Sequence, residues 1–109
     1  MKRQFVETTI FTKRWNELGL TDEDLLLLQN MLMQNPDIGD IIVDTGDARK
    51  IRFALPGKGK SGGARVIYVD VLHDKQMYLL LCYGKAKQET LMPEQKQQLR
   101  RYIRAIKED

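Results

Sequence analysis

The sequence predicts an α+β fold with the element order β-α-α-β-β-β-β-α, in which strands joined by short turns form a sheet dominated by antiparallel pairs. Three observations indicate this fold. Segments rich in β-branched and aromatic residues alternate with turn residues through the middle of the chain. Two segments with helical features come before them, and apolar residues at helical spacing follow Pro93. A chain of 109 residues is expected to form one domain, residues 1–109, around one core.

The N-terminal part is expected to contain the first strand and a short helix. Residues 5–11, FVETTIF, consist mostly of β-branched and aromatic side chains, which favour a strand. Residues 12–18 are expected to be a short helical segment, and Gly19 is expected to end it.

A longer helix is expected next. Thr21, followed three residues later by Asp24, resembles a helix N-cap sequence, and the acidic side chains behind Thr21 suit the positive end of a helix dipole. This helix is expected to run to about Gln34 and to stop before Pro36.

Two hairpins are expected to follow. The first joins residues 41–44 to residues 48–55 through the turn sequence TGD. The second joins residues 64–72 to residues 77–83, which are apolar enough to be a central strand. Between the hairpins, residues 56–63 contain four glycines and are expected to form a loop.

Charge is distributed unevenly along the chain. Residues 1–47 contain four Lys/Arg and nine Asp/Glu, a net charge of −5, whereas residues 48–109 contain fourteen and six, a net charge of +8. A basic cluster raises the local concentration of phosphates, so this asymmetry indicates one face for a polyanion and another for different contacts.

Six basic residues and no acidic one lie between Ala48 and Val69. Alternation along the expected strand 48–55 puts Lys50 and Arg52 together on the sheet face opposite the apolar residues. Arginine presents a planar fork to phosphate oxygens, and the glycines of the following loop allow a ligand to approach closely. These features favour contact with a phosphate backbone, of RNA or of DNA. The alternative is an ordinary solvated strand face, because exposed charges are common.

Other familiar catalytic sets do not match the sequence. The glycine loop contains Lys60-Ser61, as a P-loop does, but it leads into a strand rather than a helix, which argues against nucleotide hydrolysis. The single histidine, His73, lies in an expected turn, and Cys82 lies in an apolar run, so neither is expected to perform chemistry. With no close group of metal ligands near the basic region, we expect no metal and no cofactor.

The apolar runs of the chain are short. None approaches the roughly 20 residues that a membrane-spanning helix needs, and the N-terminal sequence MKRQFVETTIF lacks the apolar core of a signal peptide. A cytoplasmic protein without membrane contact is therefore expected.

Residues 45–68, TGDARKIRFALPGKGKSGGARVIY, resemble the central motif of RelE/HigB-type toxins of type II toxin-antitoxin systems, within the RelE/ParE superfamily. The matching features are a glycine turn, an R-K-hydrophobic-R strand, a G-x-G-K-S-G-G loop and an R-V-I-Y strand. Residues 79–91 resemble the family's closing strand and its link to the last helix, and residues 32–40 resemble its helix end and Asn-Pro turn. The resemblance covers about residues 25–105.

The resemblance implies a small RelE-like fold with two helices on one side of the sheet and the last helix near the other. It also implies a toxin that acts as a ribosome-dependent, metal-independent mRNA endonuclease, an mRNA interferase that inhibits translation. The implied partners are messenger RNA, the ribosome and a cognate antitoxin of the helix-turn-helix HigA type. A ParE-type inhibitor of DNA gyrase and a non-catalytic nucleic-acid-binding protein remain as alternatives on the same fold.

The resemblance also assigns site residues. Five positions match catalytic positions of the family motif: Lys50, Arg52, Arg65, Tyr83 and Lys85. By the resemblance, Arg52 and Arg65 would stabilise the phosphorane, and Lys50 or Lys85 would exchange a proton. Tyr83 fits the family's aromatic residue, with a packing role as its alternative. RNA or ribosome contacts are expected from four further basic residues: Arg49, Lys58, Lys60 and Lys87.

The chain departs from some relatives in two places. They have an arginine at the position of Ala86 and a tyrosine near the position of Leu91, so the identity of the general base stays open. Arg65 is expected to be a surface side chain that reaches a phosphate, and Arg65→Ala is therefore expected to end activity with little effect on stability.

Overall fold

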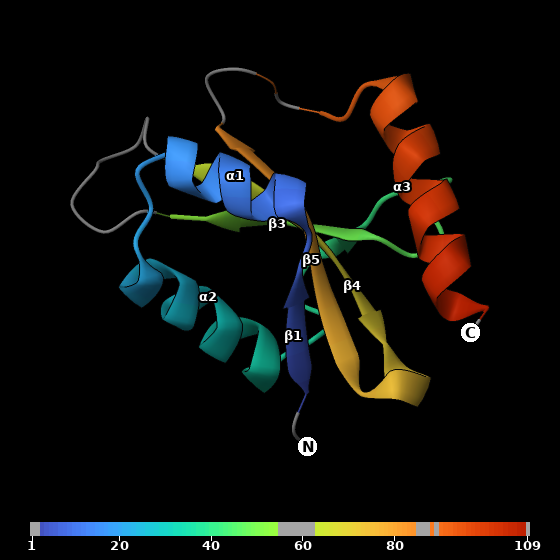
Figure 1. Cartoon of the computed structure of the whole chain (residues 1–109), viewed down its shortest axis with the longest axis horizontal. Coiled ribbons are helices and arrows are strands. Elements are labelled where there is room, and N and C mark those ends of the chain that lie inside the picture. The colour runs from blue at the N-terminus through green and yellow to red at the C-terminus, as the bar shows by residue number, and fades with distance from the viewer. Residues whose placement is uncertain (1–2, 55–62, 85–87, 89, 109) are drawn as a thin grey trace.

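A computed structural model describes residues 3–54, 63–84, 88 and 90–108. It contains a five-stranded sheet with two helices against one face and a third helix against the other (Figure 1). In chain order the elements are β1 (Gln4–Glu7), α1 (Thr9–Glu17), α2 (Asp22–Gln34), β2 (Asp40–Ile41), β3 (Arg49–Phe53), β4 (Ala64–Val71), the 3-10 turn η2 (Leu72–Asp74), β5 (Gln76–Gly84) and α3 (Pro93–Lys107).

The sheet has the strand order β1-β5-β4-β3-β2. β1 is parallel to β5, and the other three neighbouring pairs are antiparallel. The predicted element order and the antiparallel-dominated sheet are therefore confirmed. The ends of β3, β4 and β5 differ by one or two residues from the predicted strands. The predicted loop 56–63 lies outside the described residues except for Gly63.

The first strand is shorter than predicted, because Thr8 starts a helix within residues 5–11. The Thr8 side chain accepts a hydrogen bond from the N–H of Phe11 at 3.0 Å, which satisfies a donor in the first turn of α1. One helical turn apart, Phe11 and Trp15 are both buried, and their rings stack with centroids 5.5 Å apart. The cap and this burial outweigh the β propensity of the segment.

The cap predicted for the second helix is confirmed. The Thr21 side chain accepts from the N–H of Asp24 at 3.1 Å, and the Asp24 carboxylate accepts from the N–H of Thr21 at 2.9 Å. These reciprocal bonds satisfy two N–H groups at the start of α2. The three helices have 9, 13 and 15 residues, and none within the described chain is long and apolar enough to cross a membrane.

β2 contains two residues rather than the four predicted at 41–44, because the chain turns early. The Thr45 hydroxyl donates to the carbonyl of Ile42 at 2.7 Å and accepts from the N–H of Ala48 at 3.2 Å. Asp44 takes a left-handed conformation with φ of 65°. Thr45 is fully buried, so its side chain forms the interior of the turn that leads into β3.

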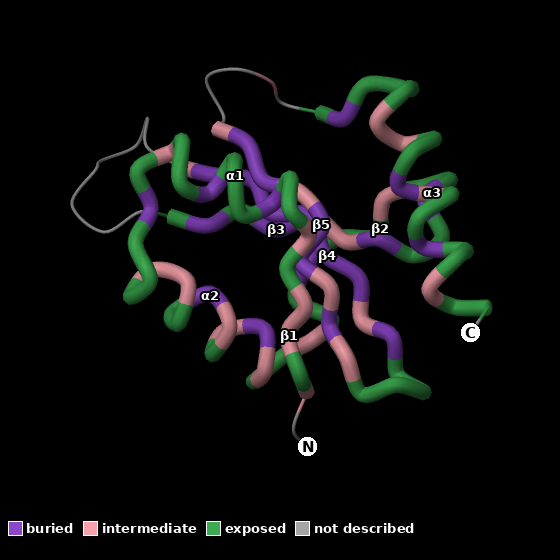
Figure 2. The backbone as a smooth tube through the Cα atoms, in the orientation of Figure 1, coloured by how far each residue is buried: buried purple, intermediate pink, exposed green. Residues whose placement is uncertain are grey.

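The sheet separates two clusters of buried side chains, and Figure 2 shows that burial concentrates on the central strands. One cluster, which we call the α1/α2 core, includes Phe11, Trp15, Leu28 and Leu32 of the two N-terminal helices. The other, the α3 core, includes Leu99 and Ile103 of the last helix together with the following residues of the sheet and its connections: Ala48, Ile67, Val69, Val71, Leu80, Tyr83 and Leu91.

Tyr68 of β4 fastens the connection between α2 and β2 to the sheet. Its hydroxyl accepts from the N–H of Gly39 at 2.9 Å and donates to the carbonyl of Pro36 at 2.8 Å. Burial raises the pKa of this phenol, so it remains a donor at neutral pH. Gly39 lies so close to β3 that an added Cβ would be 2.5 Å from Cγ2 of Ile51. The position of the connection between α2 and β2 therefore depends on Tyr68 and on Gly39.

We predict that Tyr68→Phe lowers the free energy of unfolding by about 1–3 kcal/mol, because the buried N–H of Gly39 loses its acceptor. Urea unfolding followed by circular dichroism measures this change. Tyr78→Phe is the matched control, since that hydroxyl donates to the side chain of Gln76. An equal loss in both variants would contradict the anchoring role of Tyr68.

Candidate functional site

Three of the predicted site residues lie side by side across the sheet. Arg52 of β3 is paired with Arg65 of β4, and Arg65 is paired with Tyr83 of β5. Neighbouring strands are ~4.8 Å apart, so the Cα atoms of the three residues span about 10 Å. We call this set the β3–β5 row.

The row faces α3. Arg65 lies between Ala64 and Val66, both fully buried, and Val66 belongs to the α1/α2 core, so the Arg65 side chain lies on the other face. Lys50 is two residues before Arg52 and pairs with Ile67 of the α3 core, which places it on the same face. The prediction that Lys50 and Arg52 share a sheet face is confirmed.

A β-bulge in β5 brings Tyr83 to this face. Ile67 is paired with Leu81 but Tyr68 is paired with Leu79, so Leu80 is an extra residue in β5. Met77 and Leu79 pack in the α1/α2 core, and simple alternation from them would also place Tyr83 there. The extra residue shifts the alternation, and Tyr83 packs in the α3 core beside Arg65. Alternation within β5 alone gives no indication of this placement.

The three side chains of the row differ in exposure. Arg52 is exposed, whereas Arg65 is 3% exposed and Tyr83 is 7% exposed. The Arg65 guanidinium lies back over Gly63, where an added Cβ would be 3.8 Å from Nη1. The expectation that Arg65 is a surface charge is therefore wrong, because Arg65 lies on the central strand β4 and is almost fully buried. Its replacement is therefore expected to affect stability.

No carboxylate of the three central strands neutralises the row. Asp70 is the one acidic residue of β3, β4 and β5, and it lies on the face opposite Arg65. There it accepts from Arg3, with Nε 2.8 Å from Oδ1 and Nη2 3.1 Å from Oδ2. This hydrogen bond raises the pKa of Arg3. The acidic residue of these three strands therefore lies on the face away from Arg52 and Arg65.

Arg49 does not join the row. It is on the opposite side of β3 from Lys50, and its Nη1 donates to the carbonyls of Gly39 at 2.7 Å and Asp37 at 3.2 Å. Its Nη2 is also 3.5 Å from the Asp37 carboxylate. The structure thus places Arg49 against the loop that Tyr68 anchors, on the sheet face opposite Lys50 and Arg52.

Four predicted lysines lie outside the described residues: Lys58, Lys60, Lys85 and Lys87. Their predicted roles stay predictions. The candidate site that the structure defines consists of Lys50, Arg52, Arg65 and Tyr83.

The remaining reactive groups, Cys82 and His73, are not part of the row. Cys82 is fully buried in the α1/α2 core, and burial raises the pKa of its thiol to about 12, so it stays protonated. His73 is exposed in η2 with Nε2 3.4 Å from Asp74. Among the described residues, no three His, Cys, Asp or Glu side chains are grouped as ligands of a metal ion.

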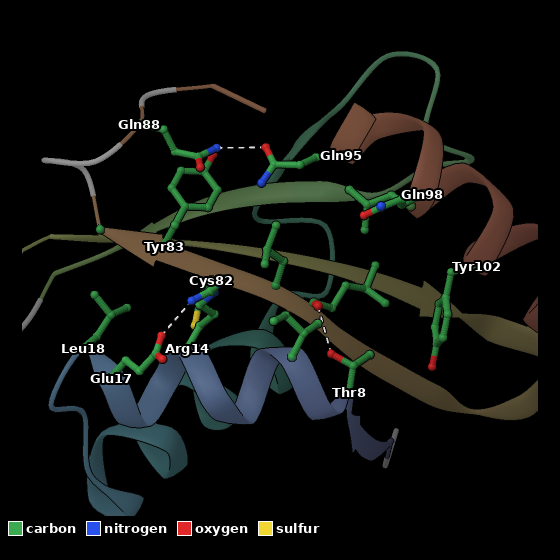
Figure 3. A pocket seen from close by; sticks show the side chains of 15 residues that line it. Thr8, Arg14, Glu17, Leu18, Cys82, Tyr83, Gln88, Gln95, Gln98 and Tyr102 are labelled. Carbon is green, nitrogen blue, oxygen red and sulfur yellow. Dashed lines mark hydrogen bonds and ion pairs between the residues drawn. The ribbon is translucent and has the colours of Figure 1, made fainter. Parts of the chain in front are cut away.

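The row is continuous with a trough between α1 and α3. The trough has a volume of about 590 Å³, and its floor is the second half of β5, including Leu80, Leu81 and Tyr83. Figure 3 shows α1 along one side of β5 and Gln95, Gln98 and Tyr102 of α3 on the other. We call it the α1–α3 trough. Its lining comes from segments far apart in sequence, so the sequence analysis did not find it. One local feature could have indicated part of it: Gln95 is the third residue of α3, a position where glutamine caps the first turn.

The row suits chemistry at a phosphodiester. Two arginines side by side offer charged donors in fixed positions, and these stabilise the extra negative charge of a five-coordinate phosphorus. Arg65 lies in a site from which water is largely excluded, where its interaction with an anion is stronger than in bulk water. Lys50 supplies an amine on this face, whereas the hydroxyl of Tyr83 is buried.

The fold is similar to that of a solved structure, a double arginine-to-alanine mutant of the E. coli toxin RelE in the free state. The TM-score is 0.55, the sequences are 19% identical, and the match covers 80% of this chain and 86% of that chain. No family model matches the sequence. At this identity the likeness concerns the fold, and the chain has the RelE-like fold that its central motif implied.

Proposed function

We propose that this protein is the toxin of a toxin-antitoxin pair and that it cuts messenger RNA on the ribosome. The observation that carries the proposal is the β3–β5 row, in which Arg52, Arg65 and Tyr83 occupy adjacent strands on a face without acidic side chains from those strands. The RelE-like fold supports a toxin function, and the row supplies groups that a ribonuclease needs. The proposed site of action is the cytoplasm.

The proposed reaction is an internal transfer within the RNA. The ribose 2′-oxygen attacks the adjacent phosphorus, the bond to the 5′-oxygen breaks, and a 2′,3′-cyclic phosphate and a 5′-hydroxyl result. Arg52 and Arg65 stabilise the negative charge on the phosphorane. A base takes the proton of the 2′-hydroxyl and an acid protonates the leaving 5′-oxygen, roles that we propose for Lys50 and Lys85. The buried hydroxyl of Tyr83 favours the packing role for that residue. Neither step uses a metal ion.

The proposed partners divide between two kinds of surface. RNA and the ribosome meet the basic face, with Lys58, Lys60 and Lys87 on the phosphate backbone. A cognate antitoxin of the HigA type holds the toxin inactive. The acidic N-terminal half of the chain, with its net charge of −5, provides a surface that a polyanion avoids.

We predict that production of this chain without its antitoxin stops protein synthesis within minutes and leaves the chromosome intact. Incorporation of labelled methionine and of labelled thymidine, followed in parallel, measures the two processes, with uninduced cells as the reference. Continued protein synthesis together with gyrase-dependent DNA breaks would contradict the proposal and favour the ParE-type alternative.

A further inference from the structure

The α1–α3 trough differs from the β3–β5 row in its charge. Arg14 and Glu17 are the charged side chains that line it, and they pair with each other at 2.8 Å. The rest of the lining described by the structure is uncharged. A phosphate group therefore meets better partners at the row, whereas an uncharged group suits the trough.

Two glutamine side chains at the end of the trough are held in defined orientations. The amide nitrogen of Gln88 donates to the carbonyl of Thr90 at 3.0 Å and to Oε1 of Gln95 at 3.1 Å. The same Oε1 accepts from the N–H of Met92 at 2.9 Å. Because a backbone carbonyl only accepts and an N–H only donates, neither amide is free to exchange its nitrogen and oxygen.

These contacts leave one donor and one acceptor for a ligand. Within the described part of the chain, they engage neither Nε2 of Gln95 nor Oε1 of Gln88. Figure 3 shows the Gln95 nitrogen turned toward the trough. A fixed donor beside a fixed acceptor discriminates among planar ligands by the pattern of their edges.

The trough also offers flat aromatic and apolar surface. Tyr83 lies on its floor beside Leu81, and Tyr102 on its wall is 40% exposed, with its ring edge-on to Tyr78 at a centroid distance of 6.3 Å. Proteins bind unstacked RNA bases by combining such rings with hydrogen bonds to the base edge. A volume of about 590 Å³ is in the range of small-molecule sites, roughly 300–1,000 Å³, and accommodates a nucleobase with its ribose.

We propose that the α1–α3 trough binds the RNA base next to the cut phosphate and that Gln88 and Gln95 select which base is accepted. The inference rests on the proposed function and names the specificity determinant of the same site. Tyr83 belongs to both the row and the trough, so a nucleotide whose phosphate lies on Arg65 places its base toward β5 and α3. The preference of the enzyme among codons then originates partly in the toxin.

The test is binding of trinucleotides that cannot be cut. A set of 2′-O-methyl RNA trinucleotides, which differ in the central base and lack the attacking hydroxyl, is titrated into the purified protein by calorimetry. Gln95→Glu keeps the acceptor for the N–H of Met92 and replaces the donor that faces the ligand. Its affinity for the preferred trinucleotide is expected to fall about tenfold, with a changed order of preference among the four bases.

Gln97→Glu is the matched control. It makes the same chemical change on α3, at an exposed position that does not line the trough, and its affinities should stay within about twofold of the wild type. Equal affinity of the wild type for all four trinucleotides, or equal losses in the two variants, would overturn the inference. So would a Gln95→Glu protein that loses antitoxin binding but keeps trinucleotide preference, because the trough would then bind protein.

The two proposals fail in different ways. If the wild type cuts translated messages but binds the trinucleotides without preference, the trough is not a base site and the proposed function stands. If the wild type binds one trinucleotide selectively and Gln95→Glu removes this preference, but no message is cut, the proposed nuclease function fails and the base site stands.

Discussion

Arg65→Ala is expected to reduce cleavage of translated messenger RNA by about 10²-fold or more. Arg65 is the middle residue of the β3–β5 row and lies largely out of water, where a charged donor to the phosphorane contributes most. Rates of cleavage in a purified translation system measure the loss. The same change should lower the free energy of unfolding by roughly 2 kcal/mol, because it removes buried side-chain volume.

Arg65→Met separates the two effects. Methionine fills much of the space of the arginine and has no charge to bury, so its stability should exceed that of Arg65→Ala. Cleavage should be as low as in Arg65→Ala, because the charged donor is missing in both. Recovery of cleavage in Arg65→Met would mean that the residue supports packing alone, and the chemical role of the row would be wrong.

Arg52→Ala is expected to reduce cleavage by about 10- to 10²-fold while the free energy of unfolding changes by no more than about 0.5 kcal/mol. Arg52 is exposed at the end of the row, so its loss removes a charged donor without leaving a cavity. Cleavage rates and urea unfolding on the same preparations give both numbers.

Lys13→Ala is the control for the loss of one positive charge. Lys13 is exposed on α1, outside the row and the α1–α3 trough, and its removal should leave cleavage within about twofold of the wild type. An equal decrease in both variants would show that overall charge, rather than the position of Arg52, determines activity.

The order of the elements was predictable because its signals are local. The reciprocal cap of Thr21 and Asp24, the TGD turn and the apolar positions behind Pro93 each lie within a few neighbouring residues. The strand boundary near Thr8 was missed, although threonine is a common N-cap, because the β-branched residues around it gave a stronger signal for a strand.

The candidate site was only partly predictable, because it depends on register between strands. Lys50 and Arg52 share a face through alternation within one strand, which a sequence shows. The placement of Tyr83 beside Arg65 depends on the bulge at Leu80. The burial of Arg65 is a property of the tertiary structure. Alternation and composition do not specify such long-range pairing.

The same limit applies to the α1–α3 trough. Its lining joins α1, β5, α3 and Gln88, and no short motif connects them. The capping role of Gln95 could have been predicted from local sequence, since Pro93 indicates the start of α3 and the third helical position favours glutamine or glutamate. That its other amide atom faces a cavity follows from the tertiary structure alone.

The most direct test of the proposed function compares two versions of one message in a purified translation system that contains the protein. One version has a start codon and is translated, and the other has the start codon removed. Primer extension maps the 5′ ends that cleavage creates. The proposal predicts cuts within the reading frame of the translated message, absent from the untranslated one and reduced about 10²-fold by Arg65→Ala. Equal cutting of both messages, or an intact translated message, would contradict it.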